Sequence, residues 1–343
     1  MPIQTDIDPE LAAFAAEQGL VAEGETAVWT PLAGGVSSDI WRLDAGGRTV
    51  CVKRALAKLR VADDWRAPVS RNLYEWRWFE TVRGYFPDAA PRTIAADPAR
   101  GVFAMAFLPA EDYRLWKAEL LAGRVDPAFA AAVGHQLGLI HAATARSEAV
   151  AEAFPTDALF FALRLEPYLL AAAARRPRVA AQLRALVERT GALHLALVHG
   201  DVSPKNILIG PRGPVFLDAE TAWYGDPAFD LAFCLNHLLL KALVVPGARP
   251  ALAASFAALT EAYLAQVGWE PPQAIEARAA GLLPGLMLAR VDGKSPVEYL
   301  TSDADKDVVR AVAEPLLLAP VKRLAEVARA WAVALDSRGR GHV

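Results

Sequence analysis

The sequence predicts an α+β fold in which a small, strand-rich N-terminal part precedes a larger, mainly helical C-terminal part. Two observations lead to this expectation. From residue 27 to residue 108, short runs that alternate polar and apolar side chains are separated by glycine turns, which is typical of antiparallel strands. After Pro109, apolar residues recur at helical spacing almost to the C-terminus. We therefore expect an N-terminal lobe over residues 1–108 and a C-terminal lobe over residues 109–343.

The composition narrows the class of protein. With 343 residues, of which 54% are hydrophobic, the chain can bury a large core, and its net charge of −3 offers no basic face to nucleic acid. The N-terminus lacks the segments of a signal peptide, and the apolar stretches are interrupted before membrane-spanning length. Cys51 and Cys234 fit buried thiols in a reducing compartment. We expect a cytoplasmic protein without nucleic-acid or membrane partners.

The first elements along the chain are a helix and a strand pair. Residues 8–19 carry apolar side chains at helical spacing and end at a glycine, which predicts a short helix. Residues 30–43 indicate strand, turn and strand, with Gly34, Gly35 and Ser37 in the turn. Paired glycines let backbone amides approach a polyphosphate closely, so the turn is a candidate nucleotide contact. An ordinary hairpin is the alternative.

The next predicted strand ends at Lys53, and a helix follows it. A lysine that follows a glycine turn in this way can reach the α- and β-phosphates of a nucleotide if a helix glutamate holds it. Glu75 is the first candidate for that glutamate, and Glu80 is the second. The alternatives are a solvated strand end for Lys53, and a surface charge or an ion pair with Arg71 for Glu75.

The C-terminal part contains a series of predicted helices. Asp126 followed by proline predicts a helix start, and His141, at the end of its apolar stripe, fits a core or capping residue. Later helices are expected over residues 163–174, 179–186, 226–241, 251–267, 272–289 and 305–335, the last with breaks at Pro315 and Pro320.

The most informative motif surrounds a predicted hairpin. Two short apolar runs, 207–209 and 215–217, flank a Gly-Pro-Arg-Gly-Pro turn. Asp201 lies in the loop before the first run, and Asp218 ends the second. The two carboxylates and the amide of Asn206 are therefore expected at one end of the hairpin.

Phosphoryl transfer needs such an arrangement. One carboxylate takes the proton of the attacking hydroxyl, while an asparagine and a second carboxylate hold the Mg²⁺ that bridges the nucleotide phosphates. His199, Asp201 and Asn206 occupy the fixed positions of the kinase pattern His-x-Asp-x-x-x-x-Asn. Asp201 is therefore the candidate base, and Asn206 and Asp218 are candidate Mg²⁺ ligands, with Glu220 as a further candidate. A polar turn between strands is the alternative.

Residues 199–206, His-Gly-Asp-Val-Ser-Pro-Lys-Asn, and the later Leu-Asp-Ala-Glu resemble the motif of the aminoglycoside phosphotransferase and choline kinase superfamily, which shares the protein-kinase fold. Residues 218–225 are similar to the methylthioribose kinase branch of that superfamily, which has Asp-x-Glu at this place. The resemblance implies a bilobal protein-kinase-like fold, with a small antiparallel-sheet N-lobe and a larger, mainly helical C-lobe, and it implies ATP as the phosphate donor.

The resemblance also implies roles for single residues. Asp230 would support the catalytic loop by hydrogen bonds to its backbone, and a carboxylate favoured by a helix N-terminus is the alternative for Asp230. His199 would likewise lie behind the residues that contact the substrate. Met105, Phe107 and Leu108 would supply the hinge whose backbone groups read the adenine edge. An ordinary buried strand is compatible with the same three residues.

Residues 288–300 place charged side chains in an otherwise apolar helical region. The resemblance implies that this loop binds the acceptor and that Arg290 meets the acceptor or the transferred phosphate. A turn held by ion pairs is the alternative. Lys205 would offset the charge of the γ-phosphate or form a surface salt bridge. The chain departs from methylthioribose kinases at Asn206, where they carry Ser, and at Val291, where they often carry a second arginine.

Together these features predict an ATP- and Mg²⁺-dependent kinase that phosphorylates a hydroxyl of a small metabolite of the sugar or thiosugar type. The second hypothesis is an aminoglycoside antibiotic phosphotransferase, although the mixed charges of residues 286–308 do not form the dense acidic pocket that a polycation needs. The third is a nucleotide-binding regulator without turnover. The sequence leaves open the acceptor, the oligomeric state and the choice between ATP and GTP.

Overall fold

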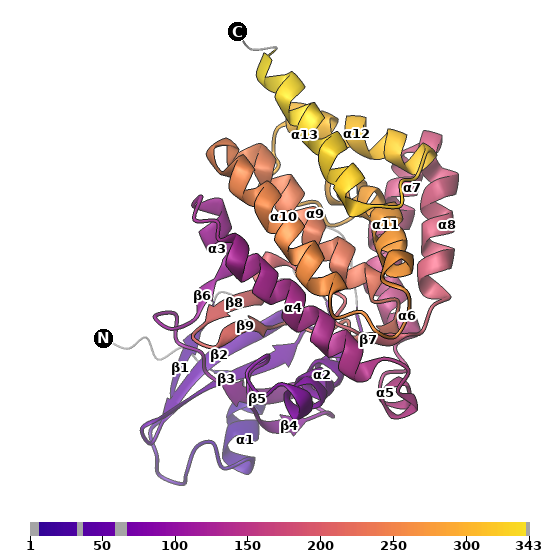
Figure 1. Cartoon of the computed structure of the whole chain (residues 1–343). Coiled ribbons are helices and arrows are strands. Elements are labelled where there is room, and N and C mark those ends of the chain that lie inside the picture. The colour runs from indigo at the N-terminus through magenta and orange to yellow at the C-terminus, as the bar shows by residue number, and fades with distance from the viewer. Residues whose placement is uncertain (1–6, 33–36, 59–66, 341–343) are drawn as a thin grey trace. The chain divides into compact units, whose positions relative to one another are not determined.

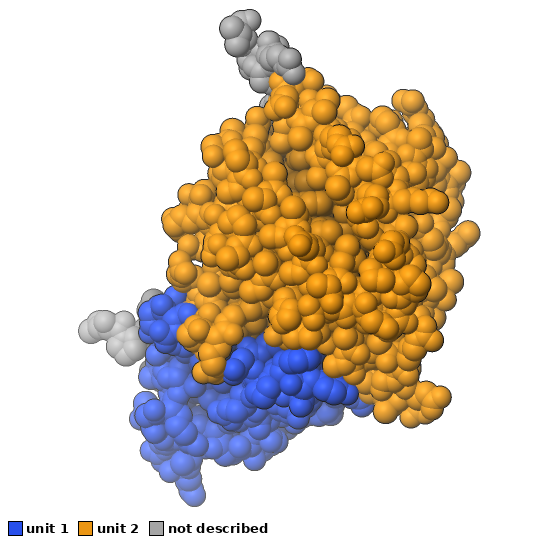
Figure 2. Space-filling view, in the orientation of Figure 1, with its two compact units in different colours: residues 1–112, 218–220 blue, residues 113–217, 221–343 orange. Residues whose placement is uncertain are grey.

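The computed structural model describes residues 7–32, 37–58 and 67–340. The chain divides into two compact units, coloured separately in Figure 2. Unit 1 comprises residues 1–112 and 218–220, and unit 2 comprises residues 113–217 and 221–343. Asp218-Ala-Glu belongs to unit 1, although its neighbours along the chain belong to unit 2. The boundary between functional lobes after residue 108 stays a prediction.

Unit 1 is built on a five-stranded antiparallel sheet with the strand order β1-β2-β3-β5-β4. Its strands are β1 (Val28–Pro31), β2 (Ser38–Ala45), β3 (Arg48–Ala55), β4 (Thr93–Asp97) and β5 (Val102–Ala106). The predicted strand pair and lysine strand are thus neighbours in one sheet, and the α+β prediction is confirmed: an antiparallel sheet precedes a mainly helical region.

Two helices accompany this sheet. Helix α1 (Pro9–Glu17) begins at Asp8, whose side chain accepts a hydrogen bond from the backbone N–H of Glu10 and caps the helix. Its buried residues Leu11 and Phe14 pack in one apolar cluster with residues of the sheet. Helix α2 (Arg71–Tyr85) packs Phe79 edge-on against Phe103 of β5. The burial of apolar side chains against the sheet therefore fixes the rotation of α2 about its own axis, and α2 carries Glu75.

Unit 2 contains the predicted hairpin. Strands β8 (Ile207–Gly210) and β9 (Gly213–Phe216) pair antiparallel, and β6 (Arg114–Leu115) extends them to a three-stranded sheet. Strand β7 (Ala196–Val198) pairs with β10 (Trp223–Gly225). The segment between β7 and β8 is therefore held at both ends by strands.

The rest of unit 2 is mainly helical (Figure 1). Helices α4 and α10 lie side by side in Figure 1, and α9, in which every residue from 228 to 243 is buried, packs against α10 and α11. The helices are α3 (Trp116–Leu121), α4 (Pro127–Thr144), α5 (Glu148–Ala153), α6 (Asp157–Phe160), π-helical η1 (Phe161–Leu170), α7 (Ala171–Arg175), α8 (Ala180–Gly191), α9 (Ala228–Val244), α10 (Arg249–Leu264), α11 (Pro272–Asp292), α12 (Asp303–Leu318) and α13 (Leu324–Arg340), with short 3₁₀ turns at Pro177–Val179, Pro204–Asn206 and Pro246–Ala248.

Two helix predictions need correction. The stretch predicted as one helix over residues 163–174 is a π-helix followed by the short helix α7, and Pro167 lies inside the π-helix. Proline lacks a backbone N–H and cannot donate the usual hydrogen bond, so the chain adopts a wider turn there. Pro315 does not break α12, which continues to Leu318 before the chain turns into α13.

Among the described residues, no helix combines the length and the apolar character that crossing a bilayer requires.

Candidate active site

Lys53 lies in the middle of the sheet of unit 1, where β3 pairs it with Ile40 on β2 and Phe103 on β5. Its buried ammonium group contacts two carboxylates. Nζ is 2.9 Å from Oε1 and 2.7 Å from Oε2 of Glu75, and 2.6 Å from Oδ1 of Asp218. Three residues that are distant in the sequence therefore meet around one positive charge.

The two glutamates of α2 have different partners. Glu75 is buried against Lys53, whereas the side chain of Glu80 accepts a hydrogen bond from the hydroxyl of Thr93. Burial raises the pKa of Glu75 to about 7, in spite of the opposing attraction of Lys53. Burial would lower the pKa of Lys53, but the attraction of Asp218 and Glu75 outweighs it and raises that pKa, so the lysine stays charged.

Asp218 reaches Lys53 from a strained backbone position. Its φ of +64° lies in the left-handed region that non-glycine residues seldom adopt. Such strain costs on the order of 1–3 kcal/mol and persists where the surrounding structure determines the conformation. The cost is consistent with a carboxylate held in place for its chemistry.

Arg71 connects Ser37 and Leu56 with Glu220. Its buried guanidinium donates to Oε2 of Glu220 at 2.9 Å and to the backbone oxygens of Ser37 at 2.5 Å and Leu56 at 2.7 Å. Arg71 thus pairs with Glu220 and not with Glu75. Ser37 at the end of the turn is described, whereas the predicted contacts Gly34 and Gly35 lie outside the described residues.

In unit 2, hydrogen bonds to the side chain of Asp230 hold the backbone of the loop that carries Asp201. The carboxylate of Asp230 accepts hydrogen bonds from the backbone N–H groups of His199 at 2.7 Å and Gly200 at 2.9 Å, which are the contacts that the resemblance implied. His141 is a buried residue, as predicted, with Nε2 3.3 Å from Asp230 and Nδ1 2.8 Å from the hydroxyl of Tyr263.

His199 connects the loop with the strand that leads to Asp218. Its Nδ1 accepts a hydrogen bond from the backbone N–H of Asp201 at 3.1 Å. Its other ring nitrogen, Nε2, therefore carries the proton and donates to the backbone oxygen of Leu217 at 3.0 Å. The side-chain amide of Asn206 donates to the backbone oxygen of Asp201 at 3.1 Å. Both residues hold the loop in one conformation.

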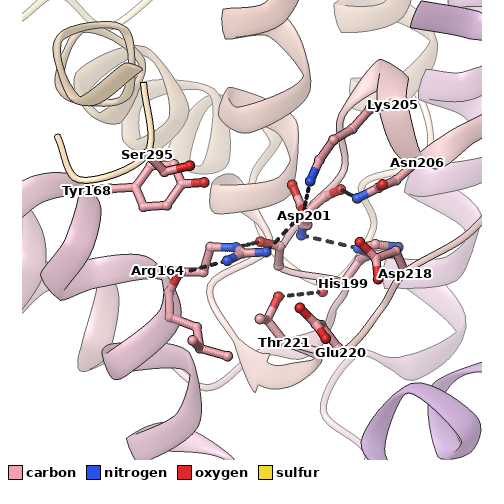
Figure 3. A network of polar contacts seen from close by, with 12 residues as sticks. Arg164, Tyr168, His199, Asp201, Lys205, Asn206, Asp218, Glu220, Thr221 and Ser295 are labelled. Atoms are coloured by element: carbon pink, nitrogen blue, oxygen red, sulfur yellow. Dashed lines mark hydrogen bonds and ion pairs between the residues drawn. The ribbon is translucent and has the colours of Figure 1, made fainter. Parts of the chain in front are cut away.

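The carboxylate of Asp201 lies between two cations (Figure 3). Its Oδ2 is 3.0 Å from Nη2 of Arg164 and 3.1 Å from Nζ of Lys205. Arg164 also donates to the backbone oxygens of Gly200 and Leu163. The sequence analysis missed Arg164. The signal available for it was the proline inside a helical pattern three residues later, because local π-helices often lie at functional sites.

Gly200 is required for the conformation of this loop. Its φ is +80°, and a Cβ atom there would lie 2.6 Å from the carbonyl oxygen of Thr221. We expect Gly200→Ala to lower the free energy of unfolding by about 1–3 kcal/mol and to reduce turnover, because Asp201 must shift with the loop. Denaturant unfolding and kinetics measure both. The control is Gly268→Ala, where an added Cβ meets open space and stability should change by less than about 0.5 kcal/mol.

Residues 288–300 form the end of α11 and the loop after it. Arg290, on the helix, donates to the hydroxyl of Tyr168 at 3.0 Å and to the backbone oxygen of Ser295 at 2.5 Å. Neighbouring charges form ion pairs: Asp292 with Arg310 at 2.6 Å, and Lys294 with Glu166 at 2.7 Å. The alternative of a turn held by ion pairs thus describes Asp292 and Lys294, but not Arg290.

Further cations lie near Arg290 in unit 2: Lys241 is buried, Lys117 is partly buried and Lys205 is exposed. Lys241, on α9, is 1% exposed, and its Nζ lies 4.7 Å from the ring centre of Tyr299. Burial, followed by repulsion from Lys117, lowers its pKa to about 7. We refer to Lys117, Lys205, Lys241 and Arg290 as the cation cluster.

The lowered pKa of Lys241 predicts that the free energy of unfolding depends on pH. The folded-state pKa of Lys241 is below its unfolded value, so the unfolded chain binds more protons between about pH 7 and 10.5. This group alone therefore increases stability with pH in that window, by up to about 1.4 kcal/mol per pH unit. We expect Lys241→Met to lose that increase, which urea unfolding at pH 7, 8 and 9 measures.

The charged or titratable groups around Lys241 are present in both proteins; they are Lys117, Cys234, His237, Arg290, Glu298 and Tyr299. Parallel stability curves for the two proteins would contradict the low pKa of Lys241.

Comparison with known proteins gives consistent results. The model of the phosphotransferase enzyme family (APH) matches residues 28–275, which is more than half of the chain. Methylthioribose kinase from Erwinia tasmaniensis is 26% identical over 235 residues, 60% of this chain and 58% of the relative. Its counterpart from Pectobacterium atrosepticum is 27% identical over 233 residues, 60% and 57% of the two chains. The chain therefore spans less than two thirds of the length of these relatives.

Two solved structures are similar in fold. Amicoumacin kinase hAmiN has a TM-score of 0.55 at 13% identity and covers 91% of this chain and 96% of its own. An aminoglycoside phosphotransferase from Alicyclobacillus acidocaldarius has a TM-score of 0.50 at 14% identity, with 99% and 98% of the chains covered. At these identities the likeness concerns the fold alone.

Proposed function

Because the chain belongs to the phosphotransferase enzyme family, we propose that it transfers the γ-phosphate of ATP to a hydroxyl of a small metabolite of the sugar or thiosugar type. The observation that carries this proposal is the contact of Lys53 with both Glu75 and Asp218. A buried lysine held by a helix glutamate is the arrangement that positions nucleotide phosphates in kinases. The likeness to methylthioribose kinases supports the sugar or thiosugar class.

The nucleotide would be bound mainly by unit 1. Lys53, oriented by Glu75, would contact the phosphates, and the turn with Gly34, Gly35 and Ser37 would cover them through its backbone amides. Met105, at the end of β5, and Phe107 and Leu108 after it would offer backbone groups to the adenine edge. In this arrangement the protein positions the phosphate and stabilises its charge, which is most of what phosphoryl transfer requires.

The residues also fit a divalent cation. Asn206 and Asp218 offer the amide and carboxylate oxygens that Mg²⁺ prefers, and Glu220 is a further candidate that Arg71 currently holds. The backbone N–H of Leu217 donates to the backbone oxygen of Asn206 at 2.8 Å, and Leu217 is followed directly by Asp218. Within the described residues no cluster of three His, Cys, Asp or Glu side chains forms a ready metal site. Mg²⁺ is usually held by one or two carboxylates together with substrate phosphates.

Asp201 would act as the base for the acceptor. Bound Mg²⁺ would neutralise charge on the β- and γ-phosphates. Asp201 would accept the proton of the acceptor hydroxyl while the oxygen attacks the γ-phosphorus and ADP leaves. Arg164, which contacts the carboxylate, would hold it in position, and Lys205 would exchange its contact with Asp201 for one with the transferred phosphate.

A coupled assay of ADP release tests the proposal. Sugars, thiosugars, amino alcohols and aminoglycosides would be offered with Mg²⁺ and ATP, and at least one small hydroxyl compound should release ADP in proportion to its concentration. If aminoglycosides alone do so, the antibiotic phosphotransferase hypothesis replaces this one. If ATP and Mg²⁺ stabilise the protein against heat but no acceptor releases ADP, the protein is a nucleotide-binding regulator.

A further inference from the structure

The cation cluster contains more positive charge than its surroundings compensate. Lys117 forms an ion pair with Glu298, and Lys205 contacts Asp201. In the part of the chain that the structure describes, neither Lys241 nor Arg290 forms an ion pair with a carboxylate, although they are only 1% and 7% exposed. A buried charge without a counter-charge destabilises a protein by several kcal/mol. Because these buried cations lower the stability of the protein, we expect them to serve a function.

Two unsatisfied polar atoms belong to the same part of unit 2. Within the described residues, Nε of Arg290 and Nε2 of His237 are buried without a hydrogen-bond partner. Buried polar groups of native proteins nearly always have a partner, so two without one beside the same cations point to a ligand. Burial and the surrounding cations keep the pKa of His237 well below its usual value, so its imidazole is neutral.

The cluster connects with Asp201 along two routes. Lys205, whose charge acts on His237, lies 3.1 Å from Oδ2 of Asp201. Arg290 binds the hydroxyl of Tyr168, and the ring of Tyr168 also faces the guanidinium of Arg164, which holds Asp201. Figure 3 shows Tyr168 and Ser295, both partners of Arg290, on the same side of Arg164. A ligand at the cluster would therefore be near the proposed base.

From this arrangement, and given the proposed kinase activity, we propose that the acceptor is an anion: a hydroxyl compound whose carboxylate or phosphate binds Arg290 and Lys241 while its hydroxyl faces Asp201. The anionic group supplies the counter-charge that the two cations lack. Arg290 is suited to the planar or forked oxygens of such groups, and Lys241 offers a point charge. The reaction is the ordinary transfer: the hydroxyl oxygen bonds to the γ-phosphorus, the bond to the β-phosphate oxygen breaks, and the proton goes to Asp201.

Matched acceptors test the proposal. The full chain would be assayed for ADP release with ribose, ribonate, ribose 5-phosphate and glucosamine, which present a neutral, carboxylate, phosphate and cationic compound of similar size. We expect kcat/KM to be at least about tenfold higher for one of the anions than for ribose, with glucosamine the poorest. The better anion identifies the group that the cluster binds. Equal or higher kcat/KM for ribose or glucosamine would overturn the proposal.

Variants assign the effect to the cluster. Arg290→Gln and Lys241→Met should raise the KM of the anion about tenfold or more, leave the KM of ATP unchanged, and lower kcat/KM much more for the anion than for ribose. Lys306→Met on α12 is the matched control, because it removes a cation that pairs only with Asp303 among the described residues. An equal loss for ribose and for the anion would show that the two residues are merely structural.

A binding measurement separates this inference from the proposed function. Calorimetry with ribonate and ribose 5-phosphate should show binding to the wild type that is weaker in Lys241→Met. Binding without ADP release would refute the kinase and keep the anion site. ADP release from neutral acceptors without anion binding would refute the anion site and keep the kinase. Lys241→Met should also raise the unfolding midpoint below pH 7, since it removes an uncompensated buried charge. A lower midpoint there contradicts the proposed excess of charge.

Discussion

Replacing Asp201 by asparagine is expected to lower kcat by about a hundred- to ten-thousandfold, the usual contribution of a general base. The asparagine keeps the shape of the side chain, and its oxygen can still accept hydrogen bonds from Arg164 and Lys205, so the fold should be retained. ATP should bind as before, because Lys53 and Glu75 are unchanged. Single-turnover kinetics would show the defect in the transfer step, and calorimetry with ADP would show unchanged affinity.

The control for this variant is Asp157→Asn. Asp157, at the start of α6, contacts His194 and the indole of Trp223, and no contact of the described structure joins it to the loop of Asp201. This control should keep the kcat of the wild type. Wild-type turnover in Asp201→Asn would exclude Asp201 as the base.

Lys53→Met is expected to reduce both stability and activity. It leaves the carboxylate of Glu75, which is 1% exposed, without its counter-ion. Breaking a buried pair in this way typically costs about 3–5 kcal/mol, although protonation of Glu75, whose pKa is already raised to about 7, would recover part of that cost. Turnover should fall by about a hundred- to a thousandfold, because one fixed charge on the phosphates is lost.

The double variant Lys53→Met/Glu75→Leu separates the two effects. It replaces the buried pair by apolar side chains, which is often neutral for stability. We expect urea unfolding to show recovered stability and kinetics to show that activity stays low. If activity returned together with stability, Lys53 would serve the fold alone and the nucleotide would be bound elsewhere.

The sequence alone predicts those structural features that depend on residues close to one another in the chain. The hairpin formed by β8 and β9, the start of α4 at Asp126 and the strand that carries Lys53 all follow from short-range signals, namely alternation, capping and turn residues, although β3 continues past Lys53 to Ala55. The choice of Glu75 over Glu80 also follows from helix periodicity, because only one face of α2 can point towards the sheet.

Other features could not be predicted because they depend on the tertiary structure. Arg164 interrupts an apolar stretch and would lie at an ordinary helical position, but the π-helix brings it to Gly200 and Asp201, more than thirty residues later. Lys241 occupies the last turn of α9, where cations usually complement the helix dipole at the surface. Its burial arises because α10 and α11 cover α9, which no local pattern indicates.

The most direct test of the central claim, that Asp201 drives phosphoryl transfer to a hydroxyl, is phosphorus NMR of a reaction with Mg²⁺, ATP and the best acceptor. The wild type should convert the γ-phosphate signal into a phosphomonoester signal, with one ADP formed per ester. Asp201→Asn should leave the ATP signals unchanged over the same time. Phosphomonoester formation by Asp201→Asn at the rate of the wild type, or inorganic phosphate as the only product of the wild type, would contradict the account.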